Sequence, residues 1–341
     1  MTPGHPLKFH PRLMERVWGG RRLATVFGRP VPPGKAIGES WEISDRPGEE
    51  SVVAEGPWRG RSLRDLMRSD REWLLGRPGP AEERFPWLAK LLDAREDLSL
   101  QVHPPASRAR ELGGEPKTEL WWVAAAEPGA RLYAGLQPGV TREEFTRRSH
   151  DGTVAACFHQ LPVQAGDALF LPSGRVHALG RGLVIFEIQQ NSDTTYRVFD
   201  WNRPGLDGRP RPLHLEPALA SIDFTDVAPS LLPRTFEEQG GETRRVLVRD
   251  PLFDVDHVRA GPGLADRRPP GTPALLAVVQ GCLAVEAGRP GEIRLGPGDF
   301  CLLPAALKAA SLHGDPGTEF LRVTVSGDTD HGNRGQSTSP A

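Results

Sequence analysis

The sequence has few cysteines and no long apolar run. Its 341 residues include three cysteines, Cys157, Cys282 and Cys301, an odd number without the spacing of metal-binding pairs. A disulfide framework of the kind found in small secreted domains is therefore not expected. No apolar stretch approaches the length of a membrane span, and the first residues, MTPGHPLKFHPRL, contain no signal-peptide-like apolar segment. We therefore expect a cytoplasmic protein that does not insert into a membrane.

An excess of charge of either sign is also missing. The chain has 42 Lys and Arg residues against 44 Asp and Glu residues, so its formal net charge is −2. This balance gives no general attraction to nucleic acid or to an acidic membrane, and neither is expected as a partner. An anionic ligand would need a local cluster of positive groups. Lysines are scarce, since only Lys8, Lys35, Lys90, Lys117 and Lys308 occur. Nothing in the sequence indicates the oligomeric state.

The apolar residues are grouped in short runs, such as LSLQVH, LFLP, LVIFEI, ALLAVV and FCLLP. Runs of this length bounded by Gly, Pro and Asp predict β-strands, and many of them predict a sandwich or barrel. Helical spacing is limited to a segment that starts at Ser62, SLRDLMRSDREWLL, and a shorter one that starts at Thr141. Both begin with a residue that can cap a helix. The sequence therefore predicts an all-β fold with a few short helices.

One predicted strand carries polar residues on a single face. In DLSLQVHPP, side chains that alternate along a strand place Ser99, Gln101 and His103 together, opposite three apolar residues. Taken alone, this pattern also fits an edge strand with ordinary polar residues. In PKTELWW, Lys117 and Glu119 share a face at the same spacing, and a solvated ion pair is the simpler interpretation of that segment by itself.

The segment GDALFLPSGRVHAL is more specific. It fits the second cupin motif, Gly-x5-Pro-x-Gly-x2-His, with Gly166, Pro172, Gly174 and His177. In this motif the Gly and Pro residues shape the turn that directs the histidine into the barrel. The alternative is a histidine at a turn that binds no metal. A weaker copy of the segment, GDFCLLPAALKAAS, begins at Gly298, and such a repeat predicts two β-barrel modules of one kind.

Together these segments provide two imidazoles, one carboxylate and one amide, on Gln101, His103, Glu119 and His177. Nitrogen and oxygen ligands without a thiolate are typical of a catalytic Zn²⁺ that keeps one position open. A dication with one glutamate leaves a charge of about +1, which favours an anionic substrate. We therefore expect one zinc ion per chain, bound by these four residues.

A further charged segment, FEIQQNSDTTYRVFDWNR, follows an apolar run. The predicted strand delivers Glu187, and Asp193, Thr195 and Arg197 alternate onto one face beyond it. Without the other motifs, a solvated loop would explain this segment equally well.

These segments, in this order, resemble the type I phosphomannose isomerase family in its short bacterial form. The resemblance is carried by IGESWEIS from Ile37, FPWLAKLLDAREDLSLQVHP from Phe85, PKTELWW, FLPSGRVHALG, EIQQNSDTTYRVFDWNR and RPLHLEPAL, and it covers roughly residues 5 to 225. It implies a cupin fold and a zinc-dependent isomerase that interconverts mannose 6-phosphate and fructose 6-phosphate. The expected partner is therefore a small sugar phosphate.

The resemblance also implies roles for individual residues. The zinc ligands would be the four residues already named, Gln101, His103, Glu119 and His177. Lys90 and Ser99 would bind the phosphate group of the substrate. The catalytic residues would be drawn from Arg197, Lys117, Glu187 and Asp193.

Two departures from the family pattern limit this transfer. In the longer members a histidine precedes the motif lysine, whereas Pro116 stands there in this chain. The residue that moves the proton therefore stays open among Lys117, Glu187 and Asp193. In the second copy of the repeat, alignment of Pro304 with Pro172 places Ala309 where the first copy has His177. We therefore predict a metal-binding cupin module over residues 1–215, a metal-free one over 216–325 and a disordered tail over 326–341. The Pro- and Arg-rich stretch from Trp201 would belong to the connection between the modules.

Other functions use the same ligand types. A non-haem iron oxygenase also needs two histidines and one carboxylate, although Gln101 and the nearby basic residues fit it less well. A cupin that binds sugar phosphate without turnover, or a structural protein without metal, are the remaining alternatives.

Overall fold

A computed structural model describes residues 4–239, 242–287 and 292–326. Its fold is mostly antiparallel β-sheet with a few short helices, as predicted. The predicted disordered tail lies outside the described residues, except for Ser326. The boundaries proposed for the two modules stay predictions.

The N-terminal half contains two sheets that face each other. The larger sheet has six strands, in the order β1 (Arg12–Gly20), β2 (Ile37–Ile43), β3 (Trp87–Ala94), β10 (Leu183–Gln190), β5 (Glu119–Ala126) and β8 (Ala168–Leu171). The smaller sheet has five strands, in the order β11 (Tyr196–Phe199), β4 (Leu100–Val102), β9 (His177–Leu179), β6 (Arg131–Leu136) and β7 (Phe158–Pro162). Runs such as LSLQVH, LFLP and LVIFEI therefore form strands, as predicted.

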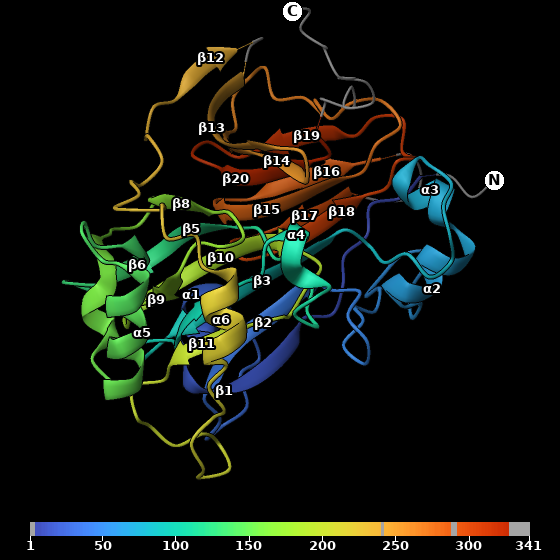
Figure 1. The fold of residues 1–341 in the computed structure, drawn as a ribbon. Coiled ribbons are helices and arrows are strands. Elements are labelled where there is room, and N and C mark those ends of the chain that lie inside the picture. The colour runs from blue at the N-terminus through green and yellow to red at the C-terminus, as the bar shows by residue number, and fades with distance from the viewer. Residues whose placement is uncertain (1–3, 240–241, 288–291, 327–341) are drawn as a thin grey trace, which may run out of the picture.

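The C-terminal half repeats this plan and lies above the first half in the view of Figure 1, in orange and red. Its larger sheet has the order β12 (Glu237–Gln239), β13 (Glu242–Asp250), β14 (Phe253–Arg259), β20 (Glu319–Thr324), β15 (Ala274–Gln280) and β18 (Phe300–Leu303). Its smaller sheet is formed by β17 (Glu292–Leu295), β16 (Leu283–Glu286) and β19 (Ser311–Gly314).

The two six-stranded sheets pack against each other through aromatic side chains. Phe186 is fully buried, and its ring centre lies 5.7 Å from that of Trp122 and 5.6 Å from that of Phe300. Its third aromatic neighbour is Phe27, the last residue of helix α1 (Arg22–Phe27), at 5.3 Å. Because neighbouring residues of a strand point to opposite faces, this packing directs Glu187 to the other face of the sheet.

The internal repeat is visible in the strand order. Strands β10, β5 and β8 of the first half correspond to β20, β15 and β18 of the second. In each half the residue before the motif proline pairs with the start of the neighbouring strand: Leu171 pairs with Glu119, and Leu303 pairs with Ala274. Ala274 therefore occupies the position in the second half that Glu119 occupies in the first.

The segment from Ser62 forms two short helices, where one was predicted. The predicted cap is present, because the Ser62 hydroxyl accepts the Asp65 amide at 3.0 Å and starts α2 (Leu63–Ser69). The helix ends at Asp70, whose carboxylate accepts hydrogen bonds from Arg61 at 2.8 Å and from Ser69 at 2.7 Å. Such local side-chain bonds compete with the helical backbone, and a separate helix, α3 (Arg71–Leu75), follows.

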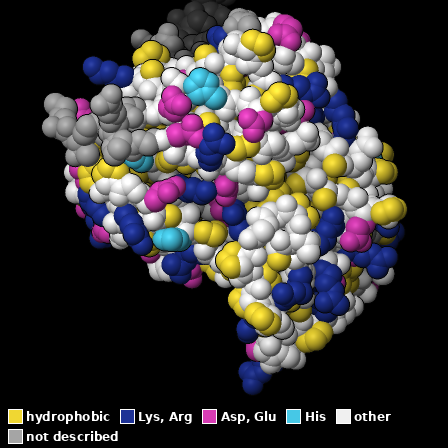
Figure 2. Space-filling model, turned by 180° about the vertical axis from the view of Figure 1, so that it is seen from behind, with side chains coloured by type: hydrophobic (Ala, Val, Ile, Leu, Met, Phe, Trp, Pro, Cys, Tyr) yellow, Lys and Arg dark blue, Asp and Glu magenta, His cyan; other side chains and the backbone are white. Residues whose placement is uncertain are grey.

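The other helices are also short. The predicted helix capped by Thr141 is α5 (Arg142–Asp151), and the remaining ones are α4 (Ala106–Ala109), the 3₁₀ helix η1 (Val154–Cys157) and α6 (Leu215–Ser221). None of the helices in the described chain has the length and apolar character that crossing a membrane requires. On the face seen from behind, basic and acidic side chains are interspersed (Figure 2), in keeping with the balanced composition.

Candidate active site

A cavity of about 610 Å³ lies in the N-terminal half, between its two sheets. The residues around it include most of those that the sequence singled out: Lys90, Ser99, Gln101, Lys117, Glu187, Asp193 and Arg197. His103, Glu119 and His177 are almost completely buried close to it. Segments that are far apart in the sequence thus meet at one place.

The six-stranded sheet contributes a row of side chains that are aligned by strand register. Trp41, Lys90, Glu187 and Trp121 are successive partners across β2, β3, β10 and β5. The Lys90 ammonium lies 3.1 Å from Glu187 Oε2, and the Trp121 indole N–H donates to Glu187 Oε1 at 2.8 Å. Lys90 also lies 5.0 Å from the ring centre of Trp41. Glu187 is therefore held in a fixed position at the wall of the cavity.

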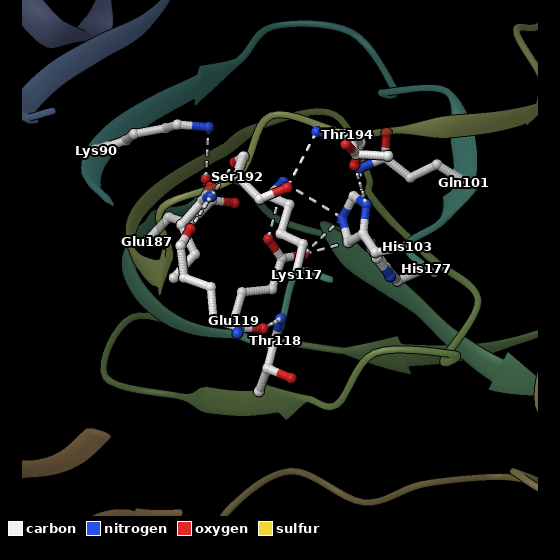
Figure 3. Close-up of polar contacts among 12 residues, drawn as sticks. Lys90, Gln101, His103, Lys117, Thr118, Glu119, His177, Glu187, Ser192 and Thr194 are labelled. Atoms are coloured by element: carbon white, nitrogen blue, oxygen red, sulfur yellow. Dashed lines mark hydrogen bonds and ion pairs between the residues drawn. The ribbon is translucent and has the colours of Figure 1, made fainter. Parts of the chain in front are cut away.

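Two histidines and one glutamate form a compact cluster beside this row (Figure 3). Nε2 of His103 lies 3.3 Å from Glu119 Oε1, and Nε2 of His177 lies 3.1 Å from the same oxygen. The potential ligand atoms of the three residues all lie within 4.8 Å of one another. Three of the four predicted metal ligands are therefore brought together around one point.

Backbone carbonyls fix both imidazole rings. Nδ1 of His103 lies 2.8 Å from the carbonyl oxygen of Thr194, and Nδ1 of His177 lies 2.9 Å from that of Arg175. A carbonyl oxygen can only accept, so each Nδ1 carries the hydrogen. Both Nε2 lone pairs consequently face Glu119, the orientation that second-sphere hydrogen bonds give to metal-binding histidines.

The turn before His177 depends on a glycine. Gly174 has a φ of +96°, a backbone conformation that side chains rarely allow. Its N–H donates to the carbonyl of His103 at 2.9 Å, and Gln101 pairs with His177 between β4 and β9. The cupin-like Gly-Pro-Gly turn therefore joins the two histidine-bearing segments directly.

Glu119 is a buried charge with few partners. Its side chain is fully buried, and neither carboxylate oxygen accepts a hydrogen bond within the described chain. Burial alone would raise its pKa, but the Lys117 ammonium, 3.1 Å away, and His103 outweigh burial and hold that pKa well below its usual range. A buried carboxylate normally needs a cation or hydrogen bonds to compensate for its lost hydration.

The neighbours of Glu119 have complementary charge states. Burial, followed by the nearby Lys117, lowers the pKa of His103 to about 3, so its imidazole is neutral at pH 7. Burial tends to lower the pKa of Lys117, but Glu119 and Glu187 raise it above its ordinary value, and the ammonium stays charged. The neutral His103 imidazole, the His177 imidazole with its Nε2 turned toward Glu119, and the ionised carboxylate form a donor set that fits a divalent cation such as zinc.

Gln101 lies next to this donor set. The side-chain amide nitrogen of Gln101 lies 3.3 Å from Nε2 of His177. A half-turn of the amide group would place its oxygen there instead, where it could act as a metal ligand. Arg197 on β11 pairs with Gln101 on β4, and both side chains line the cavity. Nη1 of Arg197 donates to the Pro212 carbonyl at 2.8 Å, while Nε has no partner among the described residues.

Asp193 lies farther out than the other predicted catalytic residues. Its side chain is 56% exposed and forms an ion pair with Arg46 Nη2 at 3.0 Å. Arg46 also binds Glu115, at 2.6 Å. Asp193 therefore lies at the rim of the cavity, held by an arginine that the sequence motifs did not single out.

The sequence-based search missed other residues around the cavity. Arg16 and Glu39 form an ion pair with a separation of 2.9 Å, and Trp41 donates to Glu39 at 2.6 Å. Burial would raise the pKa of Glu39, but Lys90 and Arg16 lower it to about 2. The alternation of Glu39 and Trp41 in IGESWEIS was a signal that could have identified both.

The Pro- and Arg-rich stretch after Trp201 also borders the cavity. Gly205, Leu206, Asp207 and Arg211 are among the lining residues. Arg211 holds this loop in place, because its Nε donates a hydrogen bond to Asp200 Oδ2 at 2.6 Å. A segment predicted only as part of a connection therefore also forms part of the candidate active site.

Comparisons with known proteins identify the family of the chain. Residues 7–136 match the family model of the catalytic domain of type I phosphomannose isomerase. A mannose-6-phosphate isomerase of Streptococcus mutans is 36% identical over 311 residues, which make up 91% of this chain and 96% of the relative.

Solved structures share the overall fold. The crystal structure of mannose 6-phosphate isomerase from Bacillus subtilis superposes with a TM-score of 0.82 at 29% identity, covering 93% of this chain and 99% of that one. A mutant phosphomannose isomerase from Salmonella typhimurium gives a TM-score of 0.75 at 16% identity, over 94% and 100% of the two chains, and shares the fold. The chain thus belongs to the type I phosphomannose isomerase family and is an isomerase.

Proposed function

We propose that this isomerase interconverts mannose 6-phosphate and fructose 6-phosphate and requires Zn²⁺ bound by Gln101, His103, Glu119 and His177. The observation that carries the proposal is the fully buried Glu119 carboxylate, which faces two oriented Nε2 lone pairs and accepts no hydrogen bond in the described chain, with Lys117 as its ion-pair partner. The named activity of the relatives supports the choice of substrate.

The reaction moves a proton between C1 and C2 of the sugar through an enediol(ate). When bound, zinc supplies Lewis-acid stabilisation of negative charge that develops on substrate oxygens. The protein residues must then hold the sugar, stabilise the anion and move the proton.

Glu187 is the residue that we assign to proton transfer. Its carboxylate lines the cavity and is positioned by Lys90 and Trp121. Lys117 carries a proton at neutral pH and therefore cannot act as the initial base. Asp193 is exposed at the rim of the cavity and forms an ion pair with Arg46. A general base must reach the proton that it removes, and the location of Glu187 meets this requirement better.

The basic residues divide into two tasks. Arg197 lies beside Gln101, close to the metal ligands, so its always-charged guanidinium would stabilise the enediolate. Lys90 and Ser99 line the cavity and would bind the phosphate group, which fixes the reacting end of the sugar. The phosphate would then share the Lys90 ammonium with Glu187, its partner in the structure.

The metal requirement and the reaction can be tested together. Purified protein should convert mannose 6-phosphate into fructose 6-phosphate, lose this activity after chelation and regain it when zinc is restored. A coupled assay for fructose 6-phosphate measures all three states. Activity that survives complete removal of metal would contradict the zinc requirement. Binding of hexose phosphate without any turnover would contradict the reaction and favour a sugar-phosphate-binding protein.

The assignment of the base predicts a contrast between two carboxylates. Glu187→Gln should lower kcat at least ~100-fold, because general-base catalysis contributes about 10²–10⁴-fold. Asp193→Asn should lower it much less, because the side chain lies at the rim. Steady-state kinetics with zinc-loaded variants of verified metal content provide the comparison. If Asp193→Asn proves the more damaging change, the proton is moved from the rim and Glu187 is not the base.

The two tasks of the basic residues predict different kinetic patterns. Lys90→Gln should raise the KM for mannose 6-phosphate and the inhibition constant of inorganic phosphate together, by about tenfold or more, because a charge-assisted hydrogen bond is lost. Arg197→Ala should instead lower kcat by at least ~100-fold with little change in phosphate inhibition. Arg209→Ala, at an exposed arginine of the adjacent loop, is the control and should change neither value.

Either assignment can fail separately. If Lys90→Gln lowers kcat and leaves the phosphate inhibition constant unchanged, Lys90 does not bind the phosphate and acts only by positioning Glu187. If Arg197→Ala weakens phosphate inhibition and leaves kcat within a few-fold of the wild type, Arg197 binds the phosphate.

A further inference from the structure

A second cavity, of about 350 Å³, lies at the junction of the two halves of the chain. The first half contributes Trp122 of β5, and the second half contributes His257 and Arg259 of β14 and Glu319 of β20. Trp122 follows Trp121, and neighbouring strand residues point to opposite faces. The junction cavity therefore lies on the opposite side of the large sheet from the candidate active site.

Positive side chains predominate around this cavity. Arg234, Arg245 and Arg259 line it, against the single carboxylate of Glu319. Arg234 is paired with Asp167 at 2.7 Å, and Arg259 with Glu319 at 3.0 Å. The lining is therefore left with a net positive charge from Arg245.

Arg245 has no carboxylate partner among the described residues, although it is only 2% exposed. Its guanidinium donates to three backbone carbonyls, those of Gly166 at 2.8 Å, Leu232 at 2.9 Å and Pro233 at 2.5 Å. These bonds give each guanidinium nitrogen one acceptor but leave the charge uncompensated. A buried charge of this kind favours a nearby anion.

Two further buried polar groups at the cavity lack hydrogen bonds. The indole N–H of Trp122, a residue 7% exposed, has no acceptor in the described chain, and Nδ1 of His257, a residue 3% exposed, has no partner there. Nε2 of His257 is paired with the carboxylate of Glu319, with 2.7 Å between Nε2 and Oε2. Its ring packs between Trp122, at 5.4 Å, and Phe236, at 5.0 Å. Unpaired polar groups are rare in folded interiors and call for a partner.

We propose that the junction cavity binds the phosphate group of a small anion. The cavity combines the Arg245 charge, the unpaired Trp122 N–H and the half-exposed Arg259 guanidinium, which meets Glu319 through its Nε. Phosphate is an anion that accepts several hydrogen bonds at once and fits such a cationic pocket. The same chemistry fits free inorganic phosphate and a phosphate monoester. This site does not depend on the proposed isomerase chemistry.

The indole N–H of Trp122 is a direct probe of occupancy. Its signal in a ¹H–¹⁵N correlation spectrum of the whole protein can be assigned as the one lost in Trp122→Phe. Titration with inorganic phosphate should shift this signal in a saturable manner. Arg259→Gln should weaken the binding about tenfold or more, whereas Arg147→Gln, which removes an exposed, ion-paired arginine of α5, should leave it unchanged.

Two further titrations distinguish this site from the active site and identify the ligand. In Lys90→Gln the titration of Trp122 should keep its wild-type dissociation constant, because the phosphate monitored is bound elsewhere. Tighter binding of glycerol 3-phosphate than of inorganic phosphate would identify a monoester as the ligand, and equal or weaker binding would identify free phosphate. A Trp122 signal that does not shift, or that shifts equally in Arg259→Gln, would overturn the proposal.

Discussion

The candidate active site is organised around one buried carboxylate. Glu119 is fully buried, the Lys117 ammonium lies 3.1 Å from it, and neither carboxylate oxygen accepts a hydrogen bond within the described chain. Because an isolated buried charge is costly, the surrounding elements must keep these groups in place. The glycine turn at Gly174 and the carbonyls that accept from His103 and His177 serve this purpose.

The repeated sheet shows what happens when this constraint is absent. In the second half, Ala274 stands at the position of Glu119, and the pair Asp256–Arg322 stands where the first half has Lys90–Glu187, with the charges exchanged. Arg322 is buried and binds Glu242 at 3.0 Å as well. These ion pairs occupy the inner face of the second sheet. They support a structural role for this half, and its lack of a metal stays a prediction.

The sequence allowed accurate prediction wherever local rules decide the structure. Strand alternation placed Gln101 and His103 together, and the Gly and Pro spacing identified the turn before His177. The position of Asp193 was not predictable in this way, because Arg46 comes from a distant segment. The same holds for the loop around Asp207, whose place at the cavity depends on tertiary packing. The break between α2 and α3 is a different case, because local bonds from Arg61 and Ser69 to Asp70 accompany it and helical spacing alone does not reveal them.

Binding of zinc by Glu119 together with Gln101, His103 and His177 can be measured on the purified protein. Elemental analysis combined with X-ray absorption at the zinc edge, on protein purified without added metal and reloaded with zinc, gives both the metal content and the ligand atoms. We expect one zinc per chain, with nitrogen and oxygen ligands at about 2.0–2.2 Å, and a loss of zinc in Glu119→Gln. Sulfur ligands at about 2.3 Å, or full zinc content in Glu119→Gln, would contradict it.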